Sequence, residues 1–379
     1  MQRNVVIAGF ARSPFHFAQK GALAKVRPDD MAAQVVEALI ARTGVPAADI
    51  EDVIVGCAFP EGEQGMNMAR LVALLAHLPI ATAGTTVNRF CGSSMQAIHM
   101  AAGAIQLDAG EVFVCAGVES MTRVQIGGFN FLPNARLVEG YPQAYMSMGE
   151  TAENVAKQYQ ITRDDQEQFA VQSHAKAAAA QAAGRFADEI VPIRRNGEAI
   201  DADGCIRPGT TKEALAGLKL AFDEHGTVTA GTSSPLTDGA AAVLVCTEDY
   251  AEKHGLDVLA RIRSVAVAGC QAEIMGIGPV AATKKALARA GLEIDDIEVV
   301  ELNEAFASQA IACVRDLMID PDMLNIDGGA LALGHPLGAT GARITGKAAA
   351  IMKREGRRYA LATQCIGGGQ GIATVLEAI

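Results

Sequence analysis

Four short segments of the sequence carry residue types that can do acyl-transfer chemistry. The first is the segment 88–95, between an expected strand and an Ala-rich helical pattern. A cysteine at a helix N-terminus faces unpaired N–H groups and the positive end of the helix dipole, and both favour a thiolate. Gly92 lets an acyl group approach the backbone, and the Cys91 N–H can donate to an oxyanion. Cys91 is therefore the candidate nucleophile, and a buried structural cysteine is the alternative.

A nucleophilic thiol needs a base, and the histidines differ in this respect. His99 lies eight residues beyond Cys91 on the same expected helix, about 12 Å away, too far to exchange a proton. His335 lies instead in a glycine-rich loop, residues 325–341, whose glycines and proline shape the backbone around the imidazole. We expect His335 to be the base. The alternative is a histidine that caps a helix or is buried in the core with its hydrogen bonds made.

Two more segments follow expected strands near the end of the chain. Residues 363–371 contain Cys365 and four glycines, whose N–H groups can form an anion nest. A second thiol beside such a nest suits proton transfer at carbon, whereas the lack of a Walker A Lys-Ser/Thr pair disfavours a phosphate loop. A buried structural cysteine is the alternative. In the segment 301–307, Asn303 either caps a helix or positions a water or a carbonyl.

Alternating strands and helices are expected to hold these segments. Short Val- and Ile-rich runs predict strands at 5–9, 53–56, 112–117, 241–246, 297–302 and 372–376. Amphipathic patterns predict helices at 30–43, 92–107, 279–290 and 342–355. The alternation is typical of an α/β fold.

The chain also contains an internal duplication. Residues 40–51 match residues 287–298 at an offset of 247 (287 − 40), and residues 101–105 match 348–351 at an offset of 246 (351 − 105). At the second offset, the residue that corresponds to Cys91 is Leu337, which lies two residues after His335. Two similar α/β halves are therefore expected to pack as pseudo-repeats, with both residues at equivalent strand–helix junctions.

Residues 122–236 have no counterpart in the second half and are expected to form an inserted loop domain. The remaining chain would then form an N-terminal half, residues 1–121 and 237–257, and a C-terminal half, residues 258–379. Insertions on a rigid scaffold often carry substrate contacts, and a stabilising decoration is the alternative. Three basic residues within this insertion either meet phosphates or form a solvated face: Arg207, Lys212 and Lys219.

Composition excludes several classes of function. The 379 residues carry 43 acidic against 32 basic side chains, and the net charge of −11 argues against nucleic-acid binding. No stretch is long and apolar enough for a membrane span, and the first apolar run is typical of a strand rather than a signal peptide. Eight cysteines without a CxxC pair or metal-ligand spacing favour a cytoplasmic setting and no metal.

Together, the four segments resemble the thiolase family over essentially the whole chain. The blocks Cys-Gly-Ser, Asn-Glu-Ala-Phe, Gly-His-Pro and Cys-x-Gly-x-Gly occur in the family's order. The resemblance implies a five-layered αβαβα thiolase fold of two pseudo-repeated halves. It also implies that Cys91 is acylated, His335 activates it, and Cys365 acts as acid and base. Asn303 would hold an oxyanion-hole water, and the N–H groups of Cys91 and Gly367 would form a second oxyanion hole.

The insertion resembles the degradative 3-ketoacyl-CoA thiolases. Biosynthetic acetoacetyl-CoA thiolases typically have a histidine where this chain has Ser147, before Met148. The resemblance therefore implies thiolytic cleavage of 3-ketoacyl-CoA by coenzyme A in fatty-acid β-oxidation. An acetyl-CoA acetyltransferase and an inactive acyl-CoA-binding scaffold are the alternatives. A decarboxylating ketoacyl synthase is more distant, because it usually needs a second histidine where this chain has Asn303.

The resemblance further implies a set of ligands and partners. Coenzyme A would bind as a substrate, with no permanently bound cofactor. Ser234 would contact its pantetheine arm, and Met148, Arg207, Lys212 and Lys219 would complete the site. Lys219 stands where many relatives have an arginine, and a lysine cannot stack as a guanidinium does. Besides acyl-CoA, the implied partners are further copies in a homodimer or homotetramer and a β-oxidation hydratase/dehydrogenase.

Overall fold

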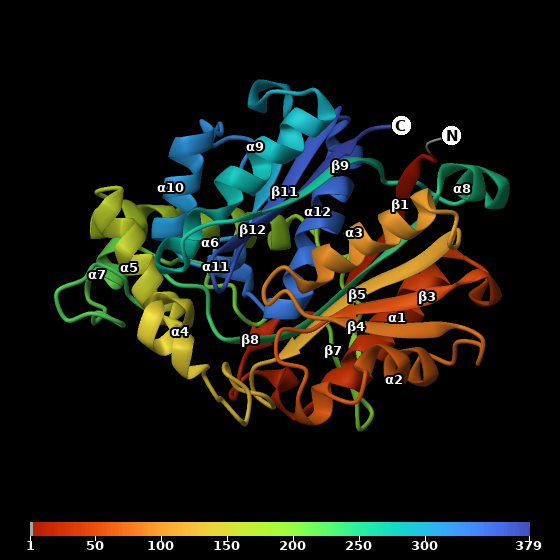
Figure 1. The fold of residues 1–379 in the computed structure, drawn as a ribbon, viewed down its shortest axis with the longest axis horizontal. Coiled ribbons are helices and arrows are strands. Elements are labelled where there is room, and N and C mark those ends of the chain that lie inside the picture. The colour runs from red at the N-terminus through yellow and green to blue at the C-terminus, as the bar shows by residue number, and fades with distance from the viewer. Residues whose placement is uncertain (1–2) are drawn as a thin grey trace.

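Two sets of strands with the same internal order form the framework of the computed structural model, which describes residues 3–379 (Figure 1). In the N-terminal set the order is β4 (Ala83–Val87), β3 (Asp52–Gly56), β5 (Val112–Ser120), β8 (Thr237–Thr247) and β1 (Val5–Arg12). In the C-terminal set it is β10 (Val299–Leu302), β11 (Tyr359–Ile366), β12 (Gln370–Glu377) and β9 (Ala260–Gly269). Leu324 forms an isolated parallel bridge with Val300 of β10. This bridge occupies the position in the C-terminal set that β4 occupies in the N-terminal set.

The directions of the strands repeat as well. β3 runs parallel to β5, and β8 is antiparallel to both β5 and β1. Likewise, β10 runs parallel to β11, and β12 is antiparallel to both β11 and β9. β1 and β9 then pair through Val6–Arg261 and Ile7–Ala260, which joins the two sets into one sheet.

Three layers of helices enclose these strands. The outer layer of the N-terminal half contains α1 (Pro28–Thr43) and α2 (Met68–Leu75); that of the C-terminal half contains α9 (Gly278–Ala290) and α10 (Ala307–Leu317). Between the two sets of strands lie α3 (Ser93–Gln106) and α12 (Thr340–Glu355), at the centre of Figure 1. These two helices touch closely at their N-terminal ends, because a Cβ on Gly341 would lie 2.2 Å from the Met95 nitrogen. The order of layers is thus the expected αβαβα.

The two halves superpose in sequence at the single offset of 247. α3 begins at Ser93 and α12 at Thr340, while β5 begins at Val112 and β11 at Tyr359. The expected correspondence between Cys91 and Leu337 is therefore wrong by one residue, and Gly338 is the equivalent position. The offset of 246 came from matching two Ala-rich helical runs, whose repeated alanines define no register.

The predicted ends of these strands and helices lie within a few residues of the observed ends. β9 was not predicted from the sequence, because its alternating arginines and partly exposed residues hide the apolar run that marks the other strands. Three short elements complete the two halves: β2 (His16–Phe17), α8 (Glu248–His254) and α11 (Ala330–Leu333).

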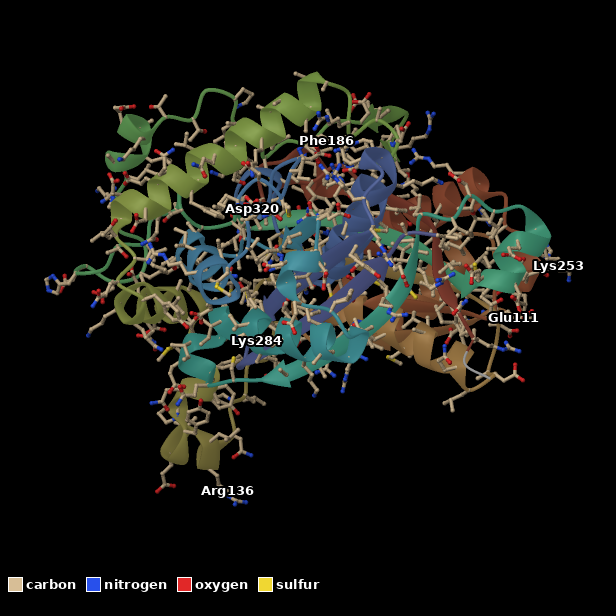
Figure 2. The ribbon with its side chains drawn as sticks, turned by 90° about the horizontal axis from the view of Figure 1, so that it is seen from above. Glu111, Arg136, Phe186, Lys253, Lys284 and Asp320 are labelled. Carbon is tan, nitrogen blue, oxygen red and sulfur yellow. The ribbon has the colours of Figure 1, made fainter. Side chains whose placement is uncertain are left out.

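The segment 122–236 contains helices and strands of its own. They are α4 (Ala135–Gly140), α5 (Met148–Gln158), α6 (Arg163–Ala182), β6 (Ile193–Arg195), β7 (Glu198–Ile200) and α7 (Lys212–Ala216). Capping boxes start α5 at Ser147 and α6 at Thr162. Figure 2 shows α4, with Arg136, projecting away from the body of the molecule. Within residues 3–379, no helix is long and apolar enough to cross a membrane.

Candidate active site

Cys91 lies in the tight connection between β4 and α3. Phe90, just before it, has a φ of +42°, and α3 begins two residues later at Ser93. Gly92 leaves no room for a side chain, because a Cβ there would lie 2.5 Å from Cδ1 of Ile366. The thiol is thus placed at the N-terminus of a central helix, as expected, and against the end of β11 from the other half.

The backbone N–H groups of Gly367 and of Cys91 itself favour the thiolate form of Cys91 and act to lower its pKa. The residue is 8% exposed, and this burial raises the pKa of the thiol to about 11 despite the two donors. The expected bias toward a thiolate is therefore outweighed by desolvation. Forming the thiolate at neutral pH requires a nearby group that takes the proton.

His335 is buried in the loop that precedes α12. Its Nδ1 lies 2.6 Å from Oγ1 of Thr340, and that hydroxyl donates to the Pro336 carbonyl oxygen at 3.2 Å. Since a hydroxyl has one proton, Thr340 accepts from Nδ1–H, and the His335 lone pair lies on Nε2. Burial, followed by the charge of Arg343, lowers the pKa of His335 to about 3, so the imidazole is neutral at physiological pH.

Asn303 lies just after β10 and contacts that imidazole. Its side-chain Nδ2 is 3.3 Å from Nε2 of His335, and its backbone N–H donates to the Thr363 carbonyl oxygen at 3.0 Å. The side-chain Oδ1 is buried and has no hydrogen-bond partner among the described residues. The helix-cap alternative is wrong, because α10 is preceded at its N-cap by Phe306. The buried oxygen is an acceptor that a water or a substrate group can use.

Cys365 lies near the end of β11, 1% exposed, in an apolar cluster with Ala152, Met275 and Phe306. Burial and the neighbouring sulfur of Cys91 raise the pKa of this thiol well above its usual range. The turn to β12 follows at once, and Gly368 and Gly369 take φ values of +79° and +85° there. The second thiol is thus a neutral acid beside the first.

Side chains from the C-terminal half hold the Cys91 turn in place. The Gln364 amide donates to the Cys91 carbonyl oxygen, and Arg89 donates to the Gln370 side chain at 2.8 Å. Neither glutamine was predicted from the sequence, although they flank Cys365 and the glycine turn. They tie the Cys91 turn to the strand and the turn that carry Cys365 and Gly367.

Glu119, near the end of β5, is a third residue that was not predicted from the sequence. Its buried carboxylate accepts from the Gly338 N–H at 2.9 Å and from the Gln64 amide at 2.8 Å. It also accepts from the N–H groups of Ala58 and Phe59 at 2.8 and 3.2 Å. Glu119 therefore joins the loop that carries the imidazole to the half that carries the nucleophile. The sequence pattern that could have pointed to Glu119 is an acidic residue near the end of an otherwise apolar strand.

The residues expected to bind coenzyme A fall into two groups. The Ser234 N–H donates to the Ala305 carbonyl oxygen at 2.9 Å, and Met148 lies beside the Cys365 cluster. Both therefore lie beside the apolar cluster that contains Cys365. Lys212 instead forms an ion pair with Asp164, while the Arg207 guanidinium stacks over Phe17 at 5.1 Å. Lys219 is exposed, and within residues 3–379 it makes no ion pair.

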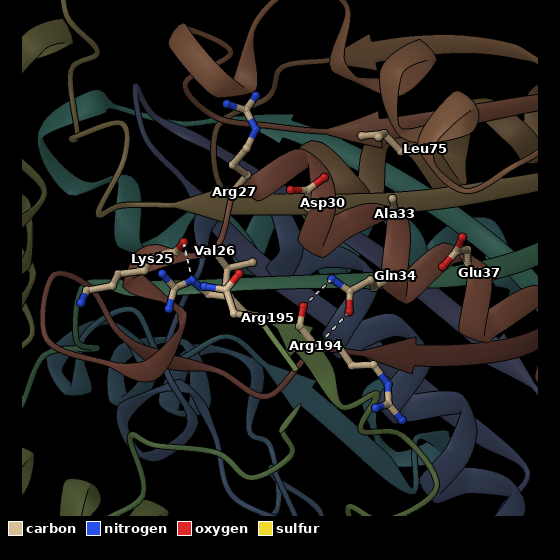
Figure 3. A pocket seen from close by; sticks show the side chains of 11 residues that line it. Lys25, Val26, Arg27, Asp30, Ala33, Gln34, Glu37, Leu75, Arg194 and Arg195 are labelled. Carbon is tan, nitrogen blue, oxygen red and sulfur yellow. Dashed lines mark hydrogen bonds between the residues drawn. The ribbon is translucent and has the colours of Figure 1, made fainter. Parts of the chain in front are cut away.

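A cavity of about 550 Å³ opens elsewhere, between α1 and the β6–β7 hairpin (Figure 3). The Gln34 side chain crosses it and bonds to the backbone of Arg194, and Arg195 donates to the Lys25 carbonyl oxygen. Its lining contains charged side chains of both signs and neither a thiol nor an imidazole. Size alone therefore does not mark the site of chemistry in this molecule.

Comparison with known proteins places this geometry in a family. The family model described as "Thiolase, N-terminal domain" matches residues 5–249, and "Thiolase, C-terminal domain" matches residues 256–378. The 3-ketoacyl-CoA thiolases of Bacillus subtilis and Shewanella frigidimarina are 47% and 49% identical to this chain, and each pair aligns over 100% of both chains.

Two solved structures share the fold at a TM-score of 0.92. Human mitochondrial 3-ketoacyl-CoA thiolase in complex with CoA is 37% identical, over 100% of this chain and 98% of that one. Bacillus anthracis acetyl-CoA acetyltransferase is 39% identical, over 100% and 99%. With both family domains and full-length relatives matched, this chain belongs to the thiolase family.

Proposed function

We propose that this protein is a 3-ketoacyl-CoA thiolase, an acyltransferase that cleaves 3-ketoacyl-CoA with coenzyme A to acetyl-CoA and a shortened acyl-CoA. The observation that carries the proposal is the pairing of two thiols, Cys91 and Cys365, beside the Gly367 N–H. One thiol can hold an acyl group while the other moves a proton at carbon. The full-length relatives that carry the name 3-ketoacyl-CoA thiolase support the same activity.

In the first half-reaction, the Cys91 sulfur attacks the 3-keto carbonyl carbon after giving its proton to Nε2 of His335. The C2–C3 bond then breaks, and its electron pair moves to C2 of the departing acetyl-CoA. Cys365 gives its proton to C2, which leaves the shortened acyl group as a thioester on Cys91. In the second half-reaction, the coenzyme A thiol gives its proton to the Cys365 thiolate and attacks that thioester. Cys91 leaves as the thiolate and takes its proton back from His335.

Charge develops on the carbonyl oxygen in both half-reactions. We assign its stabilisation to two sets of donors. One consists of the N–H groups of Cys91 and Gly367, and the other is a water held by Asn303 and shared with His335. Preformed donors in a dry site are the usual means of lowering such barriers, because they need no reorganisation as the charge forms.

Coenzyme A acts in this proposal as a substrate, and no cofactor is permanently bound. We place its contacts in an inserted loop domain, residues 122–236, between an N-terminal half (1–121 and 237–257) and a C-terminal half (258–379). Ser234 and Met148 are assigned to the pantetheine end because they lie beside the apolar cluster that contains Cys365. Lys219, Arg207 and Lys212 are assigned to the phosphates. The human thiolase bound to CoA supports coenzyme A as the ligand of this fold.

An acetyl-CoA acetyltransferase is the second candidate, since one structural relative carries that name. Ser147 distinguishes the two, because it occupies the position where the biosynthetic members typically have histidine. In this chain it caps α5 with Glu150, so the residue serves the helix rather than presenting an imidazole to the ligand. This observation favours the degradative activity.

We further propose a cytoplasmic homodimer or homotetramer that can dock to a β-oxidation hydratase/dehydrogenase. β4 ends the sheet on one side and its residues are partly exposed, so a second copy can pair with that edge. The eight cysteines are all free thiols, as in a reducing compartment. Light scattering of the purified protein, alone and with such a partner, measures both associations.

Loss of 3-ketoacyl-CoA absorbance in the presence of coenzyme A tests the activity across short to long acyl chains. Turnover of medium and long chains is the expected result. Activity confined to acetoacetyl-CoA would favour the acetyltransferase, and no turnover at any length would favour an inactive acyl-CoA-binding scaffold. Peptide mass spectrometry after incubation with acetyl-CoA should find the acyl adduct on the Cys91 peptide.

A further inference from the structure

Asn303 is followed directly by a buried carboxylate that the proposed reaction does not use. Glu304 is 2% exposed, and both of its carboxylate oxygens accept hydrogen bonds. Oε1 accepts from Nδ2 of Asn325 at 2.7 Å. Oε2 accepts from the Ser173 hydroxyl at 2.6 Å and from the Leu331 N–H at 3.1 Å. The carboxylate is therefore held by three neutral donors.

These donors come from the loop that carries His335 and from the helix beside it. Leu331 lies in the first turn of α11, which ends two residues before His335. Ser173, on α6, also accepts from the Gly329 N–H at 3.2 Å, so the serine and the carboxylate satisfy N–H groups at the start of α11. A Cβ on Gly329 would lie 2.0 Å from Cδ of Glu304. The backbone of the loop thus packs directly on the carboxylate.

Asn325 ties the start of the same loop to β10. Its side chain donates to the Leu302 carbonyl oxygen at 2.9 Å and accepts from the Leu302 N–H at 3.0 Å. Because both ends of this amide are used, it cannot turn over without losing both bonds to Leu302. Its NH₂ group must therefore face Glu304, which supplies the matching acceptor.

Together these contacts close a ring of bonds around the imidazole. Asn303 and Glu304 are neighbours in the chain, and they contact two places on the loop that lie four residues apart. Nδ2 of Asn303 lies 3.3 Å from Nε2 of His335, and Oε2 of Glu304 holds the Leu331 N–H. A carboxylate buried among neutral donors is costly, and control of this geometry gives a reason for its presence.

We propose that Glu304 is a positioning residue for the reaction, whose carboxylate holds the 325–335 loop so that the Asn303 amide and the His335 imidazole keep the separation at which they share a water. The proposal rests on the proposed function, in which that water stabilises the charge on the carbonyl oxygen. Such donors lower a barrier because they are in place before the charge forms. A displacement of about 1 Å can cost about 10²-fold in rate.

Glu304→Gln replaces one acceptor oxygen by an NH₂ group of nearly the same size. The remaining oxygen can keep the bonds from Ser173 and Leu331, but the new NH₂ group then faces the NH₂ group of Asn325. The loop should shift, so kcat of thiolysis should fall about 10- to 100-fold. KM should change less than about threefold, because the substitution alters no coenzyme A contact. Asn303→Ala, which removes the water's partner, should lower kcat by about 10²-fold.

The double variant Asn303→Ala/Glu304→Gln tests whether the carboxylate acts through the shared water. If it does, Glu304→Gln should cost less than about threefold in kcat once the Asn303 amide is gone. A purely structural role predicts the same loss in both backgrounds, and that result overturns the proposal. An unchanged kcat in Glu304→Gln overturns it as well. Rates are expressed per active site, counted as the Cys91 that acetyl-CoA acylates. Asp29→Asn, at a buried carboxylate that starts α1, is the matched control and should keep the wild-type kcat.

Ser173→Ala provides the same test if Glu304→Gln does not fold, because it removes one donor and leaves the carboxylate in place. It should lower kcat by about two- to fivefold, and this loss should disappear in the Asn303→Ala background. Equal losses in the two backgrounds would again overturn the role of Glu304. A wild-type protein without thiolysis, or Asn303→Ala with the wild-type kcat, would instead contradict the proposed function, and the role of Glu304 would fall with it.

Discussion

The junction before α3 and the junction before α12 occupy equivalent places in the two halves and have diverged in chemistry. In the first, a short turn with Phe90 at positive φ presents the Cys91 thiol. In the second, a longer glycine-rich loop ends at the equivalent Gly338 and carries His335 three residues earlier. Duplication thus provided two matching helix N-termini that meet at the centre. One came to hold the candidate nucleophile and the other the candidate base.

The following strand pairs differ in the same way. β11 and β12 are joined by the tight turn at Gly367 to Gly369, which brings to Cys91 an N–H group that favours its thiolate form. The equivalent β5 and β8 are separated by the 122–236 segment, which covers one end of the molecule. The C-terminal half therefore has a rigid turn where the N-terminal half has a large insertion. In the proposed function, the turn serves the reacting carbon and the insertion binds the coenzyme.

The largest expected effect comes from removing the thiol of the first junction. Cys91→Ala should lower thiolysis by about 10⁴-fold or more, because no acyl-enzyme can form. Cys246→Ala, a buried thiol on β8 outside the site, is the matched control and should keep its turnover. Coenzyme A-dependent loss of 3-ketoacyl-CoA measures both. Residual turnover in Cys91→Ala within tenfold of wild type would assign the nucleophile to another group.

The second thiol should be separable from the first by step. Cys365→Ser is a weaker acid, so carbon–carbon bond cleavage should fall by about 10²-fold or more, while acyl transfer from acetyl-CoA to Cys91 should persist. Deuterium exchange at the methyl group of acetyl-CoA in heavy water measures the proton transfer, and the adduct mass measures the acyl transfer. Normal exchange in Cys365→Ser would instead assign the carbon base to His335. Loss of both steps would mean that the substitution disturbs the Gly367 turn.

Particular residues show how far the sequence could predict this site. Cys91, His335, Cys365 and Asn303 were predicted as site residues because each lies beside glycines or at a strand end, and such places leave a local pattern. Glu119 and Gln364 were missed because their roles depend on partners far along the chain: Gly338 lies 219 residues from Glu119, and Cys91 lies 273 from Gln364. The contacts of Glu304 were missed for the same reason. Local sequence patterns record turns and caps well, whereas long-range polar contacts emerge only with the packing.

Histidines that are buried without charge should each lower the stability of the protein in acid, whereas Glu301, whose burial raises its pKa to about 7, should contribute in the opposite direction. Burial lowers the pKa of His335 to about 3 and that of His174 to about 4, against about 6.5 in the unfolded chain. The unfolded state then binds more protons as the pH falls below 6.5, so the free energy of unfolding should decrease by about 1.4 kcal/mol per pH unit for each histidine. Urea unfolding at pH 7, 6 and 5 measures the slope. His174→Gln should reduce the slope of the free energy of unfolding against pH by the contribution of one proton. An unchanged slope would contradict the burial of His174 in its neutral form.

The smallest effect concerns the link between the two junctions. Glu119→Gln removes a negative charge that raises the pKa of Cys91, so iodoacetamide should alkylate Cys91 a few times faster at a given pH. The same change places an amide NH₂ among donors that need an acceptor, which should loosen the Gly338 loop and slow turnover about two- to tenfold. Faster alkylation with slower turnover separates the charge of Glu119 from its hydrogen bonds. Glu63→Gln, which changes a partly exposed carboxylate next to Gln64, is the control and should change neither rate. If Glu119→Gln slows alkylation and turnover together, the link acts on Cys91 through geometry alone.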